Sequence, residues 1–369
     1  MDFDEQNPVA WLRRTRPDLF DAPDFWQTTV DEIAGAARKV TRGTMRILGQ
    51  SAGGLDIFSV AYGGREPQTP TATISSAMAS DRPEAFFDPG RRSRPALILI
   101  GSIHGGETEG IATCLNLIEI LERGADLRGT PHPQLAAQLE KMRLVIVPCL
   151  NPDGRQRAGV RHLNGAEIEH IFLVQQGVRQ DGTLLKGRSV KETHPIPPGM
   201  LRFMGGYYND NGVNLQHDDF FGPALAPENA AMQQLVRTEI PDGFLTLHAH
   251  GGHPALTAPD AYLAPGYQRR QAEVTYYILS RLTLNGHEVL DPARATGPPW
   301  SFYFQTYFAH ACGALPLLCE LPHGIAANPY PLAKTLDAGL LVVSTWIEFA
   351  LRFGLRPNSP AFYAAPPPA

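Results

Sequence analysis

Four apolar runs, each followed directly by polar residues, form the clearest pattern along the chain. They cover residues 96–103, 143–150, 244–247 and 314–319. Unbroken apolar runs of this length are typical of strands buried on both faces of a mostly parallel sheet. Because ligands bind beyond the carboxyl ends of such strands, we expect the polar residues after the runs to meet in one crevice. The pattern predicts an α/β fold, with a mostly parallel, twisted mixed sheet flanked by helices.

The segments around this sheet have weaker patterns. Residues 1–45 are amphipathic and favour helices, and residues 45–62 favour a hairpin with a Gly-Gly turn. Residues 65–95 have no clear period, so we expect a long surface loop. The Gly- and Pro-rich insertion 155–212 is expected to be an ordered loop that walls the site. The last strong helix is expected at about residues 332–353.

Composition narrows the possible functions. The chain has 369 residues, of which 43% are hydrophobic, as in ordinary globular proteins with a large core. Its net charge of -5 is spread over interspersed charges without a long basic run, which disfavours nucleic acid as a partner. Its four cysteines have no CxxC spacing and favour a reducing compartment. Without a secretory signal or a membrane span in the sequence, we expect a soluble cytoplasmic protein.

The first apolar run leads into His104-Gly-Gly-Glu107. An imidazole and a carboxylate three residues apart at a strand–helix junction can face one metal ion, and both are good zinc ligands. The two glycines allow a tight backbone turn between them. In a chain of this composition, the expected number of H-x-x-E matches that arise by chance is about one half. The tetrapeptide alone is therefore a weak signal.

A catalytic zinc site needs a third protein ligand and an open position. His248 follows the third apolar run directly and is the first candidate, with His250 second and His253 also in range. Alternatively, all three histidines bond to backbone or water in a loop. Glu320 ends the fourth run, where an ionised carboxylate is unfavourable without a partner. It fits a general base that activates water, or a carboxylate paired with a neighbouring loop.

The second apolar run leads into Asn151-Pro-Asp-Gly154, which indicates a turn. One arginine after this turn could stabilise the oxyanion of a tetrahedral intermediate, whereas the others are expected to be solvated. The candidates are Arg155, Arg157 and Arg161.

Taken in order, these motifs resemble those of the zinc metallocarboxypeptidase family, in particular its cytosolic branch. The corresponding segments are HGGE (104–107), NPDG (151–154), VNLQH (213–217), LTLH (245–248) and CELPHG (319–324). HGGE alone is not specific, but the ordered set is. The resemblance covers about residues 45–353.

This resemblance implies a metallocarboxypeptidase-like (phosphorylase/hydrolase-like) fold and one Zn²⁺ per chain, held by His104, Glu107 and His248. It implies that Glu320 deprotonates the attacking water and that Arg161 stabilises the oxyanion. Candidate substrate-binding residues are Asn151, Gln216, His217 and Tyr303, with Tyr307 as a second candidate for a tyrosine over the substrate.

On this interpretation the chain has three parts. Residues 1–44 form an N-terminal helical segment packed on the domain, and residues 45–355 form the zinc carboxypeptidase-like catalytic domain. Residues 356–369 form a Pro-rich tail.

One position departs from the family. Where the family has Asn-Arg to bind the terminal carboxylate of the substrate, this chain has Gln216-His217. A neutral histidine is a poor replacement for a bidentate guanidinium group. We therefore expect a small peptide or amide substrate with atypical carboxylate recognition. Such a substrate could lack a free carboxylate or be held by another arginine, such as Arg202.

Two alternatives stay open. The chain could be a deacylase of N-acyl amino acids similar to aspartoacylase or succinylglutamate desuccinylase, which would cleave small acyl-amino acids faster than peptides. It could also be a non-catalytic binding protein on the same fold, which would bind metal without turnover.

Overall fold

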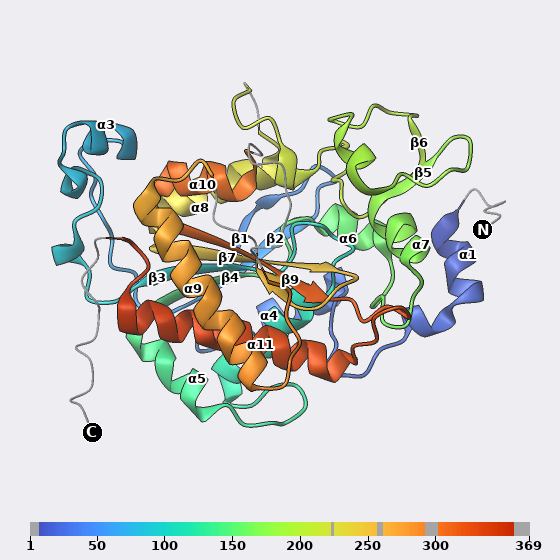
Figure 1. Ribbon diagram of the computed structural model, residues 1–369, viewed down its shortest axis with the longest axis horizontal. Coiled ribbons are helices and arrows are strands. Elements are labelled where there is room, and N and C mark those ends of the chain that lie inside the picture. Colours follow the sequence, from blue (N-terminus) through green and yellow to red (C-terminus); the bar gives the residue numbers. More distant parts are fainter. Residues whose placement is uncertain (1–6, 223–224, 257–260, 292–301, 358–369) are drawn as a thin grey trace.

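A seven-stranded mixed sheet with the strand order β1-β2-β4-β3-β7-β9-β8 runs through the molecule (Figure 1). The structure is a computed structural model and describes residues 7–222, 225–256, 261–291 and 302–357. The central strands are β3 (Ala96–Ile100), β4 (Arg143–Val147), β7 (Gly243–His250) and β9 (Leu315–Pro322). They pair in parallel in the order β4, β3, β7, β9. The predicted α/β fold with a mostly parallel mixed sheet is confirmed.

Antiparallel strands complete the sheet at both edges. The predicted hairpin is formed by β1 (Thr44–Gln50) and β2 (Asp56–Tyr62), and β2 in turn pairs with β4. At the other edge, β8 (Ala255–Leu256) pairs with β9. Both β7 and β9 continue past their apolar runs, so His248 and Glu320 lie within strands and not after them.

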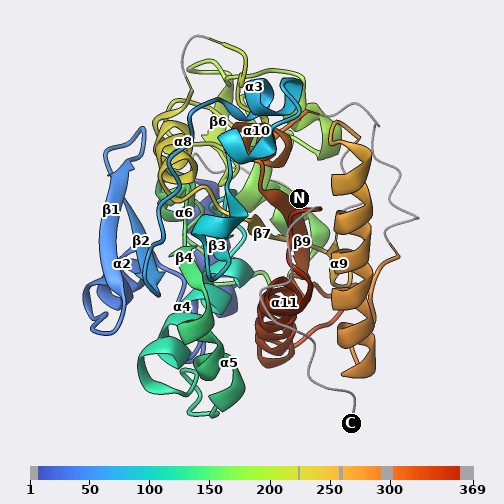
Figure 2. The same cartoon turned by 90° about the vertical axis from the view of Figure 1, so that its left-hand side faces the viewer.

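Helices cover both faces of the sheet (Figure 2). One face carries the largest apolar cluster, under α2 (Val30–Arg38), α4 (Glu109–Arg123), α9 (Pro265–Leu284) and α11 (Leu332–Phe353). The other face packs against α8 (Pro227–Glu239) and α10 (Phe304–Cys312). Within the described residues, no helix combines the length and apolarity needed to cross a membrane.

Side chains along each strand point alternately to the two faces of the sheet, and this alternation determines the face on which each site residue lies. Leu245, Leu247 and Ala249 of β7 point into the first cluster. Since neighbouring residues of a strand point to opposite faces, His248 points toward α8 and α10. The same alternation in β9 sends Cys319 into the first cluster and Glu320 to the face of His248.

The N-terminal segment from residue 7 onward packs against later parts of the chain. It contains α1 (Pro8–Thr15) and a 3₁₀ turn, Pro17–Phe20, before α2. Thr29 caps α2, because its hydroxyl oxygen accepts a hydrogen bond from the Glu32 amide while the Glu32 carboxylate accepts one from the Thr29 amide. Trp26 is fully buried in the largest cluster.

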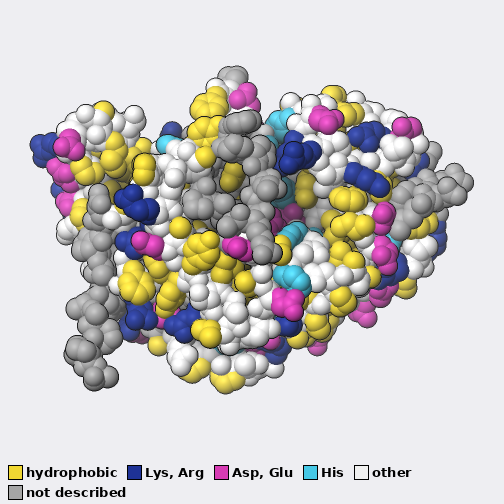
Figure 3. Space-filling model, in the orientation of Figure 1, with side chains coloured by type: hydrophobic (Ala, Val, Ile, Leu, Met, Phe, Trp, Pro, Cys, Tyr) yellow, Lys and Arg dark blue, Asp and Glu magenta, His cyan; other side chains and the backbone are white. Residues whose placement is uncertain are grey.

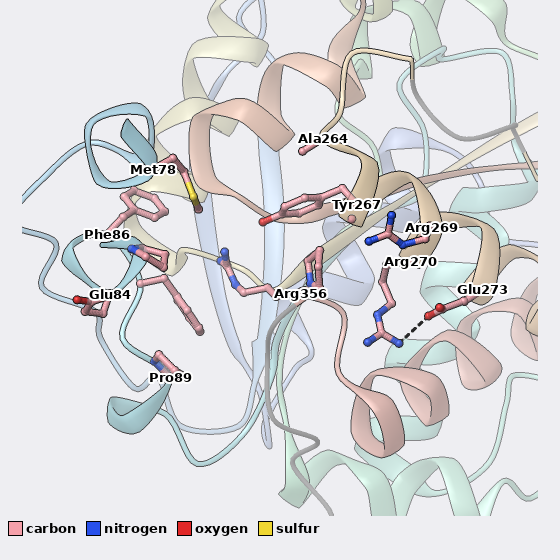
Figure 4. Close-up of a pocket in the computed structure, with 14 residues that line it drawn as sticks. Met78, Glu84, Phe86, Pro89, Ala264, Tyr267, Arg269, Arg270, Glu273 and Arg356 are labelled. Carbon is pink, nitrogen blue, oxygen red and sulfur yellow. Dashed lines mark hydrogen bonds and ion pairs between the residues drawn. The ribbon is translucent and has the colours of Figure 1, made fainter. Parts of the chain in front are cut away.

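The segment 65–95 is more ordered than predicted. It contains α3 (Ile74–Ala79) and the 3₁₀ turns Pro83–Ala85 and Pro89–Arg91. Phe86 and Phe87 bury their rings against Ala77 and Ile240. The prediction of a plain surface loop was wrong because two aromatic side chains anchor the segment without producing a periodic pattern. With α9 it borders an open pocket of about 630 Å³, lined in part by Met78, Tyr267 and Arg269 (Figure 4).

The insertion 155–212 carries its own small structure. Its elements are the end of α6 (Pro152–Ala158), α7 (Ile168–Ile171), a π-helical turn (Phe172–Gln176), β5 (Gly177–Arg179), a 3₁₀ turn (Gly187–Lys191) and β6 (Leu201–Met204). Strands β5 and β6 pair as a separate two-stranded sheet. Within the described residues, the remaining elements are α5 (Pro133–Gln138) and the 3₁₀ turns Leu139–Lys141 and Leu215–His217.

The carboxylate of Asp242 links the start of β3 to two arginines that are distant in the sequence. Its carboxylate accepts a hydrogen bond from the Ala96 amide at 2.8 Å and contacts Arg92 at 3.4 Å and Arg356 at 3.1 Å. The three charged side chains are buried. Asp242→Asn removes the carboxylate that both buried guanidinium groups contact, so we expect the free energy of unfolding to fall by about 3–5 kcal/mol.

Urea unfolding checks this expectation. Asp18→Asn is the control, because it removes a carboxylate from the more exposed pair with Arg16 and should change stability by less than about 1 kcal/mol. Equal losses in the two variants would contradict a special role for the buried cluster.

Candidate metal centre

Three buried side chains meet near the carboxyl ends of β3 and β7. His104 and Glu107 lie between β3 and α4, and His248 lies near the end of β7. One ligand atom from each lies within 4.8 Å of the other two. Nδ1 of His104 is 2.8 Å from one carboxylate oxygen of Glu107, and Nδ1 of His248 is 3.0 Å from the other. The carboxylate therefore sits between two imidazole nitrogens.

The electrostatics of this cluster favour an ionised Glu107. Burial alone raises the pKa of Glu107, but His104 and His248 together outweigh burial and hold that pKa well below its usual value. Burial lowers the pKa of His248, yet the neighbouring Glu107 raises it above the ordinary histidine value. The cluster thus presents a carboxylate to any cation that enters between the histidines.

Unsatisfied buried atoms test whether a metal fits here. Oε2 of Glu107 is close to His248, but the geometry is not that of a hydrogen bond, and this buried oxygen has no donor. Leaving a buried polar atom unsatisfied is unfavourable by about 1–3 kcal/mol, more for a charged group. Two imidazoles and one carboxylate form a catalytic zinc ligand set that leaves a coordination position open. The residues present therefore fit a Zn²⁺ ion.

Two further residues orient His104. Asn214 Oδ1 lies 3.2 Å from Nε2 of His104, so that nitrogen can carry the proton and leave Nδ1 free to bind a metal. The ring of Tyr207 stacks on His104 with centroids 3.9 Å apart. Asn214 belongs to the VNLQH segment and its spacing could have marked it, whereas no sequence pattern marks Tyr207.

The two glycines between the ligands are required by close packing. A Cβ atom at Gly105 would lie 2.0 Å from the backbone nitrogen of Arg155, and one at Gly106 would lie 2.6 Å from the side chain of Gln175. The Gly105 amide also donates to the Gly206 carbonyl at 2.7 Å. The loop that carries His104 and Glu107, here called the ligand loop, therefore packs closely between α6 and the end of the insertion.

Asn151 caps α6 beneath this loop. Its Oδ1 accepts a hydrogen bond from the Gly154 amide at 2.9 Å, and its Nδ2 donates to the Gly206 carbonyl at 3.3 Å. Asn151 is fully buried. A direct contact between Asn151 and substrate, as the resemblance implies, would require these bonds to rearrange.

Glu320 lies beside His248. The two residues are register partners in the parallel pair of β7 and β9, and both point to the α8/α10 face. Glu320 is partly exposed and is not one of the three grouped ligand residues. This placement leaves its carboxylate accessible next to the candidate metal centre.

The alternative third ligands are bonded elsewhere. Nε2 of His250 lies 2.7 Å from the His253 carbonyl, and His253 pairs with Glu288 at 3.2 Å. Neither belongs to the grouped ligand set.

The arginines after the NPDG turn all have partners. Arg155 is buried and donates to the carbonyls of Gly105 and Val160. Arg157 pairs with Asp210. Arg161 pairs with Glu32 at 2.8 Å and donates to the Trp26 carbonyl at 2.9 Å. Arg161 therefore has to leave its bonds to the N-terminal segment before it can serve an oxyanion.

Neither Gln216 nor His217 provides a positively charged group that could bind a carboxylate. Gln216 is buried and donates to Gln305 at 2.6 Å. Burial, with the positive charges of neighbours including Lys191, lowers the pKa of His217 to about 3, so its imidazole is neutral at pH 7. The His217 ring contacts Tyr303 edge-on with centroids 6.3 Å apart.

Tyr307, the second candidate tyrosine, lies in α10, and its side chain contacts Phe220 and α8. Its ring stacks on Phe220, and its hydroxyl bonds to Gln233 of α8. This favours Tyr303 over Tyr307 as a residue near the substrate.

The sequence matches one known family. A family model described as zinc carboxypeptidase matches residues 35–253, more than half of the chain. The matched stretch contains His104, Glu107 and His248, whereas Glu320 lies beyond it. A search among curated proteins finds no significant match.

Solved structures share the fold. A metallo-carboxypeptidase from Burkholderia cenocepacia has a TM-score of 0.52 and 15% identity, over 85% of this chain and 66% of that one. A metallo-carboxypeptidase from Pseudomonas aeruginosa has a TM-score of 0.52 and 15% identity, over 87% and 68%. Carboxypeptidase A from Helicoverpa armigera has a TM-score of 0.51 and 12% identity, over 91% and 80%. The chain thus spans just under two thirds of the Burkholderia protein.

His248→Ala tests the third ligand. We expect this variant to lose zinc on dialysis, because a divalent ion would keep only two protein ligands. His250→Ala should keep its zinc, since His250 bonds within its own loop. Metal analysis of both proteins checks the assignment. The reverse pattern would move the third ligand to His250.

Gly105→Ala tests the packing of the ligand loop. The added methyl group would overlap the backbone of α6, so we expect zinc affinity to fall by at least about tenfold while the sheet stays folded. Gly64→Ala is the matched control, since a Cβ atom there meets nothing within 4 Å. Competition with a fluorescent zinc chelator measures both affinities. Unchanged affinity in Gly105→Ala would show that the loop can shift without disturbing the site.

Proposed function

The chain belongs to the zinc carboxypeptidase family, and on that premise we propose that it hydrolyses a peptide or amide bond at one Zn²⁺ held by His104, Glu107 and His248. The observation that carries this proposal is the convergence of those three buried side chains, with a Glu107 oxygen that has no donor. Bound zinc would polarise the scissile carbonyl and lower the pKa of the attacking water.

Glu320 is the proposed general base. Its place beside His248 puts a partly exposed carboxylate next to the proposed metal ligands. It would accept a proton from the attacking water and pass it to the leaving amine. Asn214 and Tyr207 would keep His104 in the required tautomer and orientation during this transfer.

We propose that Arg161 stabilises the oxyanion after a change in its own conformation. Its guanidinium group bonds to Glu32 and to the Trp26 carbonyl. Binding of substrate would have to supply the free energy that releases it.

We propose a carboxypeptidase-like reaction on a small peptide or amide, with atypical recognition at the position where the family binds the substrate's terminal carboxylate. The neutral His217 and the hydrogen-bonded Gln216 support the atypical part, because neither can form a bidentate ion pair with a carboxylate. Faster cleavage of N-acyl amino acids than of peptides would instead indicate a deacylase. Stoichiometric zinc without turnover on a broad amide panel would indicate a binding protein.

Glu320→Gln tests the base. We expect kcat to fall by about 10²–10⁴-fold, because the amide cannot accept the proton, while zinc content stays unchanged. Glu273→Gln, on the outer surface of α9, is the control and should keep full activity. Steady-state kinetics and metal analysis of both variants are needed. Wild-type turnover in Glu320→Gln would remove Glu320 from the mechanism.

A further inference from the structure

A buried histidine outside the proposed mechanism links the segments that carry the site residues. His323 directly follows β9, and Glu109 is the first residue of α4, just after the ligand loop. Nδ1 of His323 lies 2.9 Å from a carboxylate oxygen of Glu109, and each side chain is only 1% exposed. Histidine side chains are visible at the surface beside the lobe that carries β5 and β6 (Figure 3), whereas the His323–Glu109 pair is enclosed.

The second ring nitrogen of His323 contacts the insertion. Nε2 lies 3.3 Å from the side-chain nitrogen of Gln175, which belongs to the π-helical turn Phe172–Gln176. With the Nδ1 proton donated to Glu109, Nε2 of the neutral ring is the acceptor for the Gln175 amide. Gln175 is fully buried as well. The ring of His323 therefore joins the start of α4 to the insertion.

Gln175 in turn lies against the ligand loop. A Cβ atom at Gly106 would lie 2.6 Å from Oε1 of Gln175, so the side chain approaches the loop as closely as a glycine allows. The Gln175 carbonyl also accepts a hydrogen bond from the Tyr207 amide at 2.8 Å, and the Tyr207 ring stacks on His104. A displacement of Gln175 would therefore disturb both the ligand loop and the ring that stacks on His104.

The backbone of His323 extends the pairing of the two strands that carry the other site residues. Its amide donates to the His250 carbonyl at 2.8 Å, just past the register pairs His248–Glu320 and His250–Pro322. A single residue is thus bonded to β7, to the first turn of α4 and to the insertion. These are the segments around the proposed metal centre.

The His323–Glu109 pair is expected to fix geometry more than to add stability. Removing one partner of a buried hydrogen bond is unfavourable, whereas replacing both partners by apolar groups of similar shape is nearly neutral. Two buried oxygens next to His323 also have no donor, Oε2 of Glu109 and Oε1 of Gln175. An apolar cluster at this place would avoid both unsatisfied atoms.

We propose that His323 is a positioning residue, which acts through Glu109 and Gln175 to hold the ligand loop in the geometry that binds zinc beside Glu320. This inference rests on the function proposed above. In contrast to Asn214, which lies next to His104 itself, His323 acts on the backbone that carries the ligands.

A double replacement separates positioning from stability. His323→Leu leaves the buried Glu109 carboxylate without its donor, so it should lower the free energy of unfolding. His323→Leu/Glu109→Met removes both polar partners and should recover most of this loss. If His323 positions the ligand loop, the zinc affinity of the double variant should still be about 10–100-fold below that of the wild type, as for other residues that support metal ligands. Urea unfolding and competition with a fluorescent zinc chelator measure the two quantities.

Hydrogen exchange of the metal-free protein gives a readout that needs neither zinc nor turnover. The amides of Gly105 and Glu107 donate to the carbonyls of Gly206 and His104. In the double variant, these two amides should exchange at least about tenfold faster than in the wild type, because the ligand loop opens more often.

Two further variants serve as controls. His323→Asn keeps an amide donor close to the position of Nδ1, so it should recover part of the zinc affinity that His323→Leu loses. Asp242→Asn disrupts the buried cluster at the start of β3, away from the ligand loop. It should lower stability while its zinc affinity stays within about twofold of the wild type.

The outcomes distinguish this inference from the proposed function. Wild-type zinc affinity in the double variant would overturn the positioning role and leave the proposed hydrolysis intact. An affinity loss no larger than that of Asp242→Asn would assign the effect to stability and would overturn the role as well. Zinc binding that depends on His323, in a wild type that cleaves no amide, would support the positioning role and contradict the proposed hydrolysis.

Discussion

The parallel register of β7 and β9 is the constraint on which the candidate site depends. It pairs His248 with Glu320, and strand alternation turns both side chains toward α8 and α10. β3 runs parallel to β7, so the loop after β3 delivers His104 and Glu107 to the same end of the sheet. The three candidate ligands His104, Glu107 and His248 can then meet beside Glu320, and none of these residues lies in a long loop.

Dense packing below the site keeps the ligand loop in place. Gly105 fits against the backbone of α6, and Gly106 fits against Gln175. A second buried pair lies nearby, with His323 Nδ1 2.9 Å from Glu109, and each side chain is only 1% exposed. Gln175 lies 3.3 Å from the other ring nitrogen of His323, and so connects the ligand loop to this pair. The insertion that contributes Gln175 therefore packs against the loop that carries His104 and Glu107.

Much of this arrangement could be predicted from sequence, because it follows from local patterns. Unbroken apolar runs marked the central strands, and the polar residues at their ends marked His104, Glu107, His248 and Glu320. Contacts between segments far apart in the chain could not be read in this way. The pairing of Arg161 with Glu32 and the stacking of Tyr207 on His104 depend on how the N-terminal segment and the insertion fold back. The division into three parts and the roles of the site residues remain predictions.

Metal content and its link to turnover test the central claim most directly. Purified protein is analysed for zinc, stripped with a chelator, and assayed on an amide panel before and after zinc is restored. We expect about one zinc per chain, loss of hydrolysis on chelation and recovery on addition of one equivalent. Hydrolysis that survives complete removal of metal, or a protein that binds no zinc, would contradict a zinc-dependent hydrolase built on His104, Glu107 and His248.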